Sequence, residues 1–230
     1  MFEAWDTAEK AGKFINADGI VCESASQEPL SDLTDERMNT ARRLIAEKCL
    51  YGVDINPLAV ELAKLSIWLV TISKGRPFGF LDHNLKSGDS LLGIHDIEQL
   101  RQLKMKPDET GFGHLFGSGI GSAVDEALEL REMIREVNIR DITDVEYMAS
   151  LHQEAQENLI KVKLLADLFI GEVFSFTGKA NKLQNQLDLL STVVDTVLSN
   201  NHEANRQYRI EAYKKLNTDL PDGKPPRRPF

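Results

Sequence analysis

The chain has 230 residues, of which 42% are hydrophobic and 27% are charged, as in an ordinary globular protein. A formal net charge of −9 excludes a generally basic surface, so the chain is not expected to be the main clamp on DNA phosphates. No apolar run reaches the roughly 18 residues of a membrane helix, and the N-terminus does not resemble a signal peptide, so we expect a cytoplasmic protein.

Residues 1–40 predict a helix, a loop and the start of a second helix. Phe2, Trp5 and Ala8 lie at helical spacing. Turn-forming residues are then frequent over 16–32 and predict a loop or a short strand-like segment. Thr34 is predicted to cap a helix that extends from Asp35 to about Glu47, because acids occupy its first turn.

A strand and a helix are predicted next. Leu50–Val53 is a short apolar run followed by a helical pattern, which is typical of a buried parallel strand. Asn56 is a favourable N-cap and Pro57 suits the first helical position. The helix is predicted to continue to about Ser73. Its polar stripe is narrow, so we expect it to be buried on most of its surface.

A second strand is predicted near 84–86, with a turn at 87–89. Helix, strand, helix and strand then follow one another over 34–92, which predicts one α/β unit with parallel topology. The fold class expected for the chain is α/β, with a large helical subdomain.

The pattern becomes helical towards the C-terminus. A short helix is predicted over 96–106, and amphipathic helices succeed one another over 123–217, as in an antiparallel hairpin or small bundle. The expected organisation is an N-terminal helix and loop, an α/β core, a glycine-rich linker, a helical region and a proline-rich tail, over 1–40, 41–100, 101–122, 123–217 and 218–230.

Two acids follow the two predicted strands and are candidate ligand-binding residues. In doubly wound folds, an acid at the carboxyl end of a strand accepts hydrogen bonds from ribose hydroxyls. Asp54 fits that position, but an aspartate there can also simply support the turn before a helix. Asp89 follows the next strand and could meet an adenine amino group beside Ser90, or form a turn without a ligand.

Other site types have little support in the sequence. The glycine-rich run "GFGHLFGSGIG" lacks the spacing of a phosphate-binding loop, and we interpret it as a linker. Cys22 and Cys49 fit a reducing compartment, and no cysteine or histidine pattern has zinc spacing. No metal site is expected.

The stretch 41–93 resembles adenine-specific DNA methyltransferases of the restriction–modification and phage-defence type, including type IIG and BREX-associated enzymes. Within it, "YGVDINPLAVELAKLSIWL" looks like their second methyltransferase motif and "FLDHNLKSGDSLLG" like their third. The helical region, with "DVEYMASLHQEAQENLIKVKLLADLF", is similar to the helical insertion that precedes their catalytic motif.

The resemblance implies a Rossmann-like methyltransferase core, S-adenosylmethionine as cofactor, and methyl transfer to N6 of an adenine flipped out of DNA. Carried over onto this sequence, Asp54 would bind the ribose hydroxyls and Ile55 would pack on the adenine ring of the cofactor. Asp89 would hold the adenine amino group, with Ser90 beside it.

Two motifs of the family do not occur in the sequence. No glycine-rich turn of the type "DPACGSG" precedes Asp54, and the catalytic tetrapeptide NPP[FY] is absent, since Asn56-Pro57 is followed by Leu58. The chain thus looks like an internal segment without catalytic residues of its own. We expect it to bind the cofactor weakly or not at all, and to reach DNA only together with the missing methyltransferase segments or domains.

Two other functions are compatible with the residues. The chain could be a helical protein-interaction module whose nucleotide-binding unit is vestigial. It could also be half of a nucleotide-binding oxidoreductase, because an acid after a strand also serves NAD.

Overall fold

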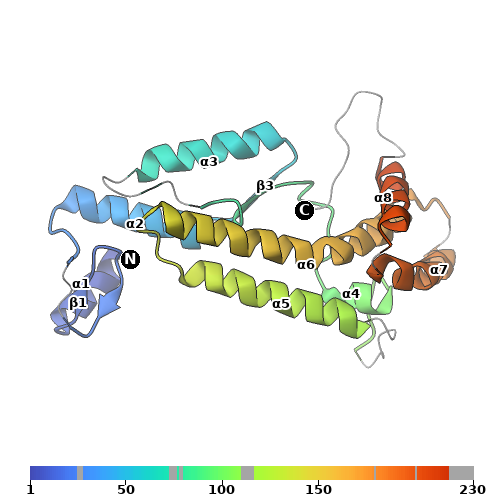
Figure 1. Ribbon diagram of the computed structural model, residues 1–230, viewed down its shortest axis with the longest axis horizontal. Helices are drawn as coiled ribbons and strands as arrows, with labels where there is room; N and C mark the ends of the chain where they lie inside the picture. Colours follow the sequence, from blue (N-terminus) through green and yellow to red (C-terminus); the bar gives the residue numbers. More distant parts are fainter. Residues whose placement is uncertain are drawn as a thin grey trace. The chain divides into compact units, whose positions relative to one another are not determined.

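The computed structural model describes residues 1–24, 28–72, 77, 80–109, 117–178, 180–199 and 201–217. It is rich in helices and contains two small sheets (Figure 1). The chain divides into two compact units, so each unit is described by itself. One unit comprises 1–52, 58–86 and 133–150, and the other comprises 53–57, 87–132 and the residues from 151 onward.

The N-terminal part of the first unit is a small α/β element. Helix α1 (Phe2–Lys10) is followed by the antiparallel strands β1 (Phe14–Ile15) and β2 (Val21–Cys22). The predicted helix is confirmed, and the predicted loop contains this short hairpin. Its core is made of four buried side chains, namely Trp5, Ile15, Leu30 and Ala41.

Helix α2 (Thr34–Lys48) has the predicted extent but a different start. Its N-cap is Leu33, which makes no side-chain capping bond, and Thr34 is already the first helical residue. The prediction that Thr34 caps the helix is therefore wrong. Asp35 and Glu36 lie in the first turn, where carboxylates interact favourably with the helix dipole, so acids support this end without a side-chain cap.

The strand–helix–strand order predicted for the centre of the chain is confirmed. Strand β3 (Gly52–Asp54) precedes α3 (Pro57–Thr71), and β4 (Leu85–Ser87) follows. The backbone N–H of Gly52 donates to the carbonyl of Asn84, and that of Gly88 donates to the carbonyl of Asp54. Because both partners advance along the chain in the same direction, the two strands are parallel.

Helix α3 begins at Pro57 as predicted, but its expected burial is wrong. Val60 is its one buried residue. Five large apolar side chains are instead 48–65% exposed, namely Leu58, Leu62, Leu65, Leu69 and Val70. In the described residues the sheet formed by β3 and β4 has two strands, and so small a sheet offers little apolar surface to a helix that is apolar on most sides.

The second unit is built around a helical core, as the amphipathic patterns predict. It contains α4 (Ile97–Gln102) and α7 (Ala180–Leu198), as well as α8 (His202–Leu216). Helices α5 (Gly117–Glu136) and α6 (Ile142–Ser175) contribute residues to both units. The largest side chains of this core are almost fully buried, namely Phe169, Leu100, Leu103, Ile120, Leu165, Leu187 and Leu216.

Helix α5 begins at Gly117, inside the range 101–122 predicted as a linker. Ile120 is fully buried in the core of the second unit, and this burial outweighs the weak helix propensity of the three glycines in "GSGIG". Residues 110–116, which carry the rest of the glycine-rich run, lie outside the described residues, as does the proline-rich tail from 218. Among the described helices, none is long and apolar enough to cross a membrane.

Candidate functional site

The candidate site lies where the parallel strands β3 and β4 end. Gly88 donates its backbone N–H to the carbonyl oxygen of Asp54 at 2.9 Å, so the last residue of β3 is bonded to the residue after β4. Asp89 follows immediately. The two predicted acids therefore occupy the same carboxyl-terminal edge, which is where ligands bind in open parallel sheets.

The Asp54 side chain is exposed and supports a turn. Its Oδ1 accepts the backbone N–H of Asn56 at 2.7 Å, directly before Pro57 starts α3. The turn role considered for this acid is therefore present in the structure. Its other carboxylate oxygen has no hydrogen-bond partner among the residues that the structure describes, so it can still accept a bond from a ligand.

Asp89 forms a similar turn. Its Oδ1 accepts the backbone N–H of Leu91 at 3.0 Å, and its carbonyl accepts the N–H of Leu92 at 3.1 Å. Leu92 packs against the core of the second unit, which anchors this turn. Ser90 is exposed. The turn thus holds the Asp89 carboxylate in a defined orientation beside the end of β3.

Two apolar side chains accompany these acids at the strand ends. Ile55, next to Asp54, is 48% exposed, and Leu91 is 91% exposed. Ile55 was predicted from the sequence, and Leu91 was not. The edge therefore offers carboxylate acceptors next to solvent-exposed aliphatic surface, which is the combination that a nucleoside requires for its hydroxyl or amino groups and for its flat base.

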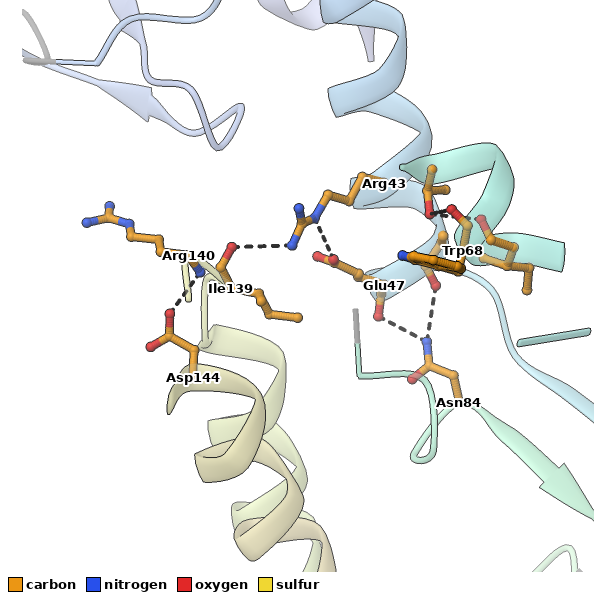
Figure 2. A network of polar contacts seen from close by, with 10 residues as sticks. Arg43, Glu47, Trp68, Asn84, Ile139, Arg140 and Asp144 are labelled. Carbon is orange, nitrogen blue, oxygen red and sulfur yellow. Dashed lines mark hydrogen bonds and ion pairs between the residues drawn. The ribbon is translucent and has the colours of Figure 1, made fainter. Parts of the chain in front are cut away.

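Asn84 holds the start of β4 against the end of α2 (Figure 2). It is 2% exposed, and its Nδ2 donates to the carbonyl of Glu47 at 3.0 Å and to that of Ala46 at 3.4 Å. The backbone carbonyl of Asn84 accepts the N–H of Gly52 at 3.0 Å. The buried side-chain amide therefore satisfies carbonyls at the helix end, while the backbone of the same residue forms the first bond of the β3–β4 pair. The sequence analysis missed this residue.

Arg43 and Glu47 extend this network towards the segment between α5 and α6. Arg43 Nε donates to Glu47 Oε1 at 2.8 Å, and its Nη2 donates to the carbonyl of Ile139 at 3.3 Å (Figure 2). Burial raises the pKa of Glu47, and the neighbouring Arg43 cation offsets part of that rise. Lys48 also donates to the carbonyl of Arg135, in the last turn of α5.

These contacts fix the backbone around the site and perform no chemistry of their own. Within the ranges that the structure describes, no group of three or more His, Cys, Asp or Glu side chains is placed to hold a metal ion. The groups at the strand ends are hydrogen-bond acceptors and apolar side chains. Groups of these kinds are suited to hydrogen bonding and apolar packing.

Comparison with known proteins defines the class. The model of a methyltransferase family, described as Eco57I restriction-modification methylase, matches residues 48–188, which is more than half of the chain. The chain therefore belongs to the Eco57I restriction-modification methylase family. Neither curated proteins nor solved structures gave a significant match.

The matched range contains both strands of the candidate site and the two acids at their carboxyl ends. It begins at Lys48, just before β3, and ends within α7, so α8 lies outside it. A methylase of this family implies DNA as substrate, and such methylases generally use S-adenosylmethionine. The predicted resemblance to DNA methyltransferases is confirmed at the level of the protein family.

Proposed function

We propose that this chain is a segment of an enzyme that transfers a methyl group from S-adenosylmethionine to N6 of adenine in DNA. Its relatives in function would be the type IIG and BREX-associated methyltransferases, which act in restriction–modification and phage defence. The α/β portion would be part of a Rossmann-like core, and the division into segments 41–100 and 123–217 would separate cofactor binding from a helical insertion.

The observation that carries the proposal is the common edge of Asp54 and Asp89. Asp54 is the last residue of β3, Asp89 lies just after β4, and the bond between Gly88 and Asp54 joins the strand ends. The carboxylate of Asp54 can accept from the ribose hydroxyls of the cofactor, and that of Asp89 can accept from the adenine amino group. The exposed Ile55 would then pack on the adenine ring, with Ser90 at its edge.

The chain alone would supply only part of the site. Neither the glycine-rich turn nor the NPP[FY] tetrapeptide occurs in its 230 residues, so it lacks the groups that would hold the methionine part of the cofactor and the target base. We expect weak or no cofactor binding and no methylation by the chain alone. The exposed apolar side of α3 is available to pack against the missing methyltransferase segments.

A second candidate function is a helical protein-interaction module with a vestigial nucleotide-binding unit. The exposed leucines of α3 favour it, because contiguous apolar surface commonly marks a protein interface. The two functions differ at Asp54, whose carboxylate matters for a cofactor and is irrelevant to a protein partner of α3.

Isothermal titration with S-adenosylmethionine tests the proposal, first on the chain itself. We expect no binding at micromolar concentration, and micromolar binding would contradict the claim of an incomplete site. The same titration is then made on a longer version of the protein that supplies both missing motifs. There, Asp54→Asn and Asp89→Asn should each weaken binding about 10- to 100-fold, as for a lost charge-assisted hydrogen bond.

Asp96→Asn is the matched control. Asp96 also accepts a backbone N–H two residues ahead, from Glu98 at 2.9 Å, but it caps α4 and does not follow a strand. This variant should bind the cofactor like the unchanged protein. If none of the three substitutions affects the cofactor, the interaction-module alternative is favoured.

A further inference from the structure

We propose that two copies of this chain pair through an exposed row of leucines on α3, with the two α3 helices side by side and antiparallel. The leucine row consists of Leu58, Leu62, Leu65 and Leu69. The pairing involves neither Asp54 nor Asp89, so it goes beyond the proposed function and does not depend on it.

The leucine row has the spacing of a coiled-coil seam. Its members are four, three and four residues apart, as the a and d positions of a heptad are, and they fall within roughly 60° of the helix surface. Their side chains are 65%, 54%, 48% and 58% exposed, in chain order. So narrow an apolar stripe is typical of a helix that pairs with one other helix.

A second copy of α3 is the partner that fits this row. On the other helices that the structure describes, no three exposed large apolar side chains alternate with this four-and-three spacing. Knobs-into-holes packing requires a facing helix with the same repeat. Within the described residues that repeat is found on α3 itself, so the matching surface is the same row on another copy.

The opposite side of α3 is fixed within the first unit. Val60 is 6% exposed and lies about 160° around the axis from Leu58. Ile67 is half-buried and lies about 160° from Leu69, and between them Lys64 donates to the carboxylate of Asp82. The helix is therefore held in place with its leucine row outward, and pairing does not require a short helix to form first.

The charges of α3 permit close approach of two copies. The helix carries two charged residues, Glu61 and Lys64, which pair with each other at 2.7 Å. Glu61 borders the leucine row, and because its charge is already balanced, two rows can meet without burying an unpaired charge. The row itself contains no polar side chain that would lose a hydrogen bond with water.

The helix ends favour the antiparallel arrangement. No acidic residue lies in the first turn of α3 and no basic residue lies in its last turn, so its own side chains leave the helix dipole uncompensated. In an antiparallel pair each N-terminus lies beside the C-terminus of the other copy, where the opposite partial charges attract. Leu58 then lies opposite Leu69 of the second copy, and Leu62 lies opposite Leu65, in a two-fold symmetric contact.

Analytical ultracentrifugation of the full chain over a range of concentrations tests the pairing. We expect a monomer–dimer equilibrium. Leu58→Ala with Leu69→Ala should raise the dimer dissociation constant about 100-fold or more, because it truncates four side chains of a symmetric contact. Alanine favours helices, so circular dichroism should show that the variant stays folded.

The matched control truncates two exposed leucines of other helices. Leu128 of α5 is 51% exposed and Leu189 of α7 is 65% exposed, and neither belongs to a row of this spacing. Leu128→Ala with Leu189→Ala removes the same number of atoms. We expect this control to keep the dimer dissociation constant of the unchanged chain.

Disulfide cross-linking tests the antiparallel direction, in chains whose two native cysteines are replaced by serine (Cys22→Ser with Cys49→Ser). A mixture of Leu58→Cys chains and Leu69→Cys chains should form a cross-linked dimer on oxidation. Leu58→Cys chains alone should not, because the two copies of residue 58 lie about 16 Å apart along the helix axis, beyond the reach of a disulfide.

The proposal is overturned if the chain stays monomeric, which would leave the leucine row to a different protein segment. It is also overturned if both double-alanine variants weaken the dimer equally, or if Leu58→Cys chains alone cross-link as well as the mixture. The cross-link decides the matter if the alanine variant fails to fold. All of these outcomes are distinct from the titration of Asp54 and Asp89 variants with S-adenosylmethionine, which tests the proposed function.

Discussion

Gly88 and Asp54 are joined by a backbone hydrogen bond of 2.9 Å that closes the parallel pair at its carboxyl end. The carbonyl of Asp54 is thus part of the β3–β4 pair, while its side chain accepts the N–H of Asn56 at 2.7 Å. The residue therefore connects the strand, the turn and the start of α3. No described residue bonds to its second carboxylate oxygen, which can therefore accept a bond from a ligand.

This geometry predicts that the structural and ligand-binding roles of Asp54 are separable. Asparagine keeps an oxygen that can accept from Asn56, so Asp54→Asn should change the free energy of unfolding by less than about 0.5 kcal/mol. Asp54→Ala removes the acceptor and should cost about 1 kcal/mol. Urea unfolding of the chain measures both. Equal destabilisation by the two substitutions would mean that the turn depends on the negative charge.

Asn84 is predicted to be the most sensitive polar residue near the site. Asn84→Ala removes the donor that reaches the carbonyls of Glu47 and Ala46 in a buried position, and should cost about 2–3 kcal/mol in the free energy of unfolding. Asn84→Asp should cost at least as much, because a carboxylate would face two carbonyl oxygens without solvent. Urea unfolding tests both variants.

Asn138 provides the control for these substitutions. It is half-buried in the same unit, and its side chain makes no hydrogen bond to any described residue. Asn138→Ala should stay within about 0.5 kcal/mol of the unchanged chain. If Asn84→Ala is equally mild, the contact between α2 and β4 does not hold the strand pair in place.

Glu47 gives a pH-dependent prediction. Its pKa in the folded chain is raised above 4.5, mainly by burial, so the folded state holds this proton more tightly than the unfolded state. The resulting stability is fully present below pH 4.5 and is lost as the pH rises through the folded pKa. Glu47→Gln removes this pH-dependent contribution to the free energy of unfolding, but it keeps a side-chain oxygen that can accept a hydrogen bond from Arg43.

The free energy of unfolding should be measured for both proteins at several pH values from below 4.5 to neutral. Relative to Glu47→Gln, the unchanged chain should lose stability as the pH rises over this range. An advantage that grows with pH would instead mean that the ion pair with Arg43 outweighs the cost of burial.

The strand–helix–strand centre could be predicted because its signals are local. A short apolar run, then Asn56-Pro57, then a second strand followed by a turn, define both the elements and their parallel direction. Parallel strands end at one edge, so the shared location of Asp54 and Asp89 followed from that topology. Their roles towards a cofactor stay predictions.

The contacts that hold this centre in place could not be predicted, because they join residues far apart in the sequence. Asn84 reaches a carbonyl 37 residues away, and Arg43 reaches one that is 96 residues away. Neither has a local pattern that distinguishes it from a solvent-exposed polar residue. The predicted start of α2 was wrong by one residue. The sequence predicts Thr34 as the N-cap, but the N-cap is Leu33, whose side chain makes no capping bond.

The exposure of α3 leads to the last prediction. An apolar pattern shows what a helix can bury, but burial also requires a neighbouring surface. Because Leu62 and Leu65 are 54% and 48% exposed, Leu62→Gln with Leu65→Gln should change the free energy of unfolding by less than about 1 kcal/mol. Leu165→Ala, at a fully buried position, should cost about 2–5 kcal/mol.

The same α3 variant should reduce self-association of the chain, measured by analytical ultracentrifugation over a range of concentrations, because it removes exposed apolar surface. A cost comparable to that of Leu165→Ala would contradict the exposed position of α3 and would show that these leucines are covered in solution. If the cost is small and self-association falls, then α3 is stable without a covering neighbour and presents apolar surface against which another protein surface can pack.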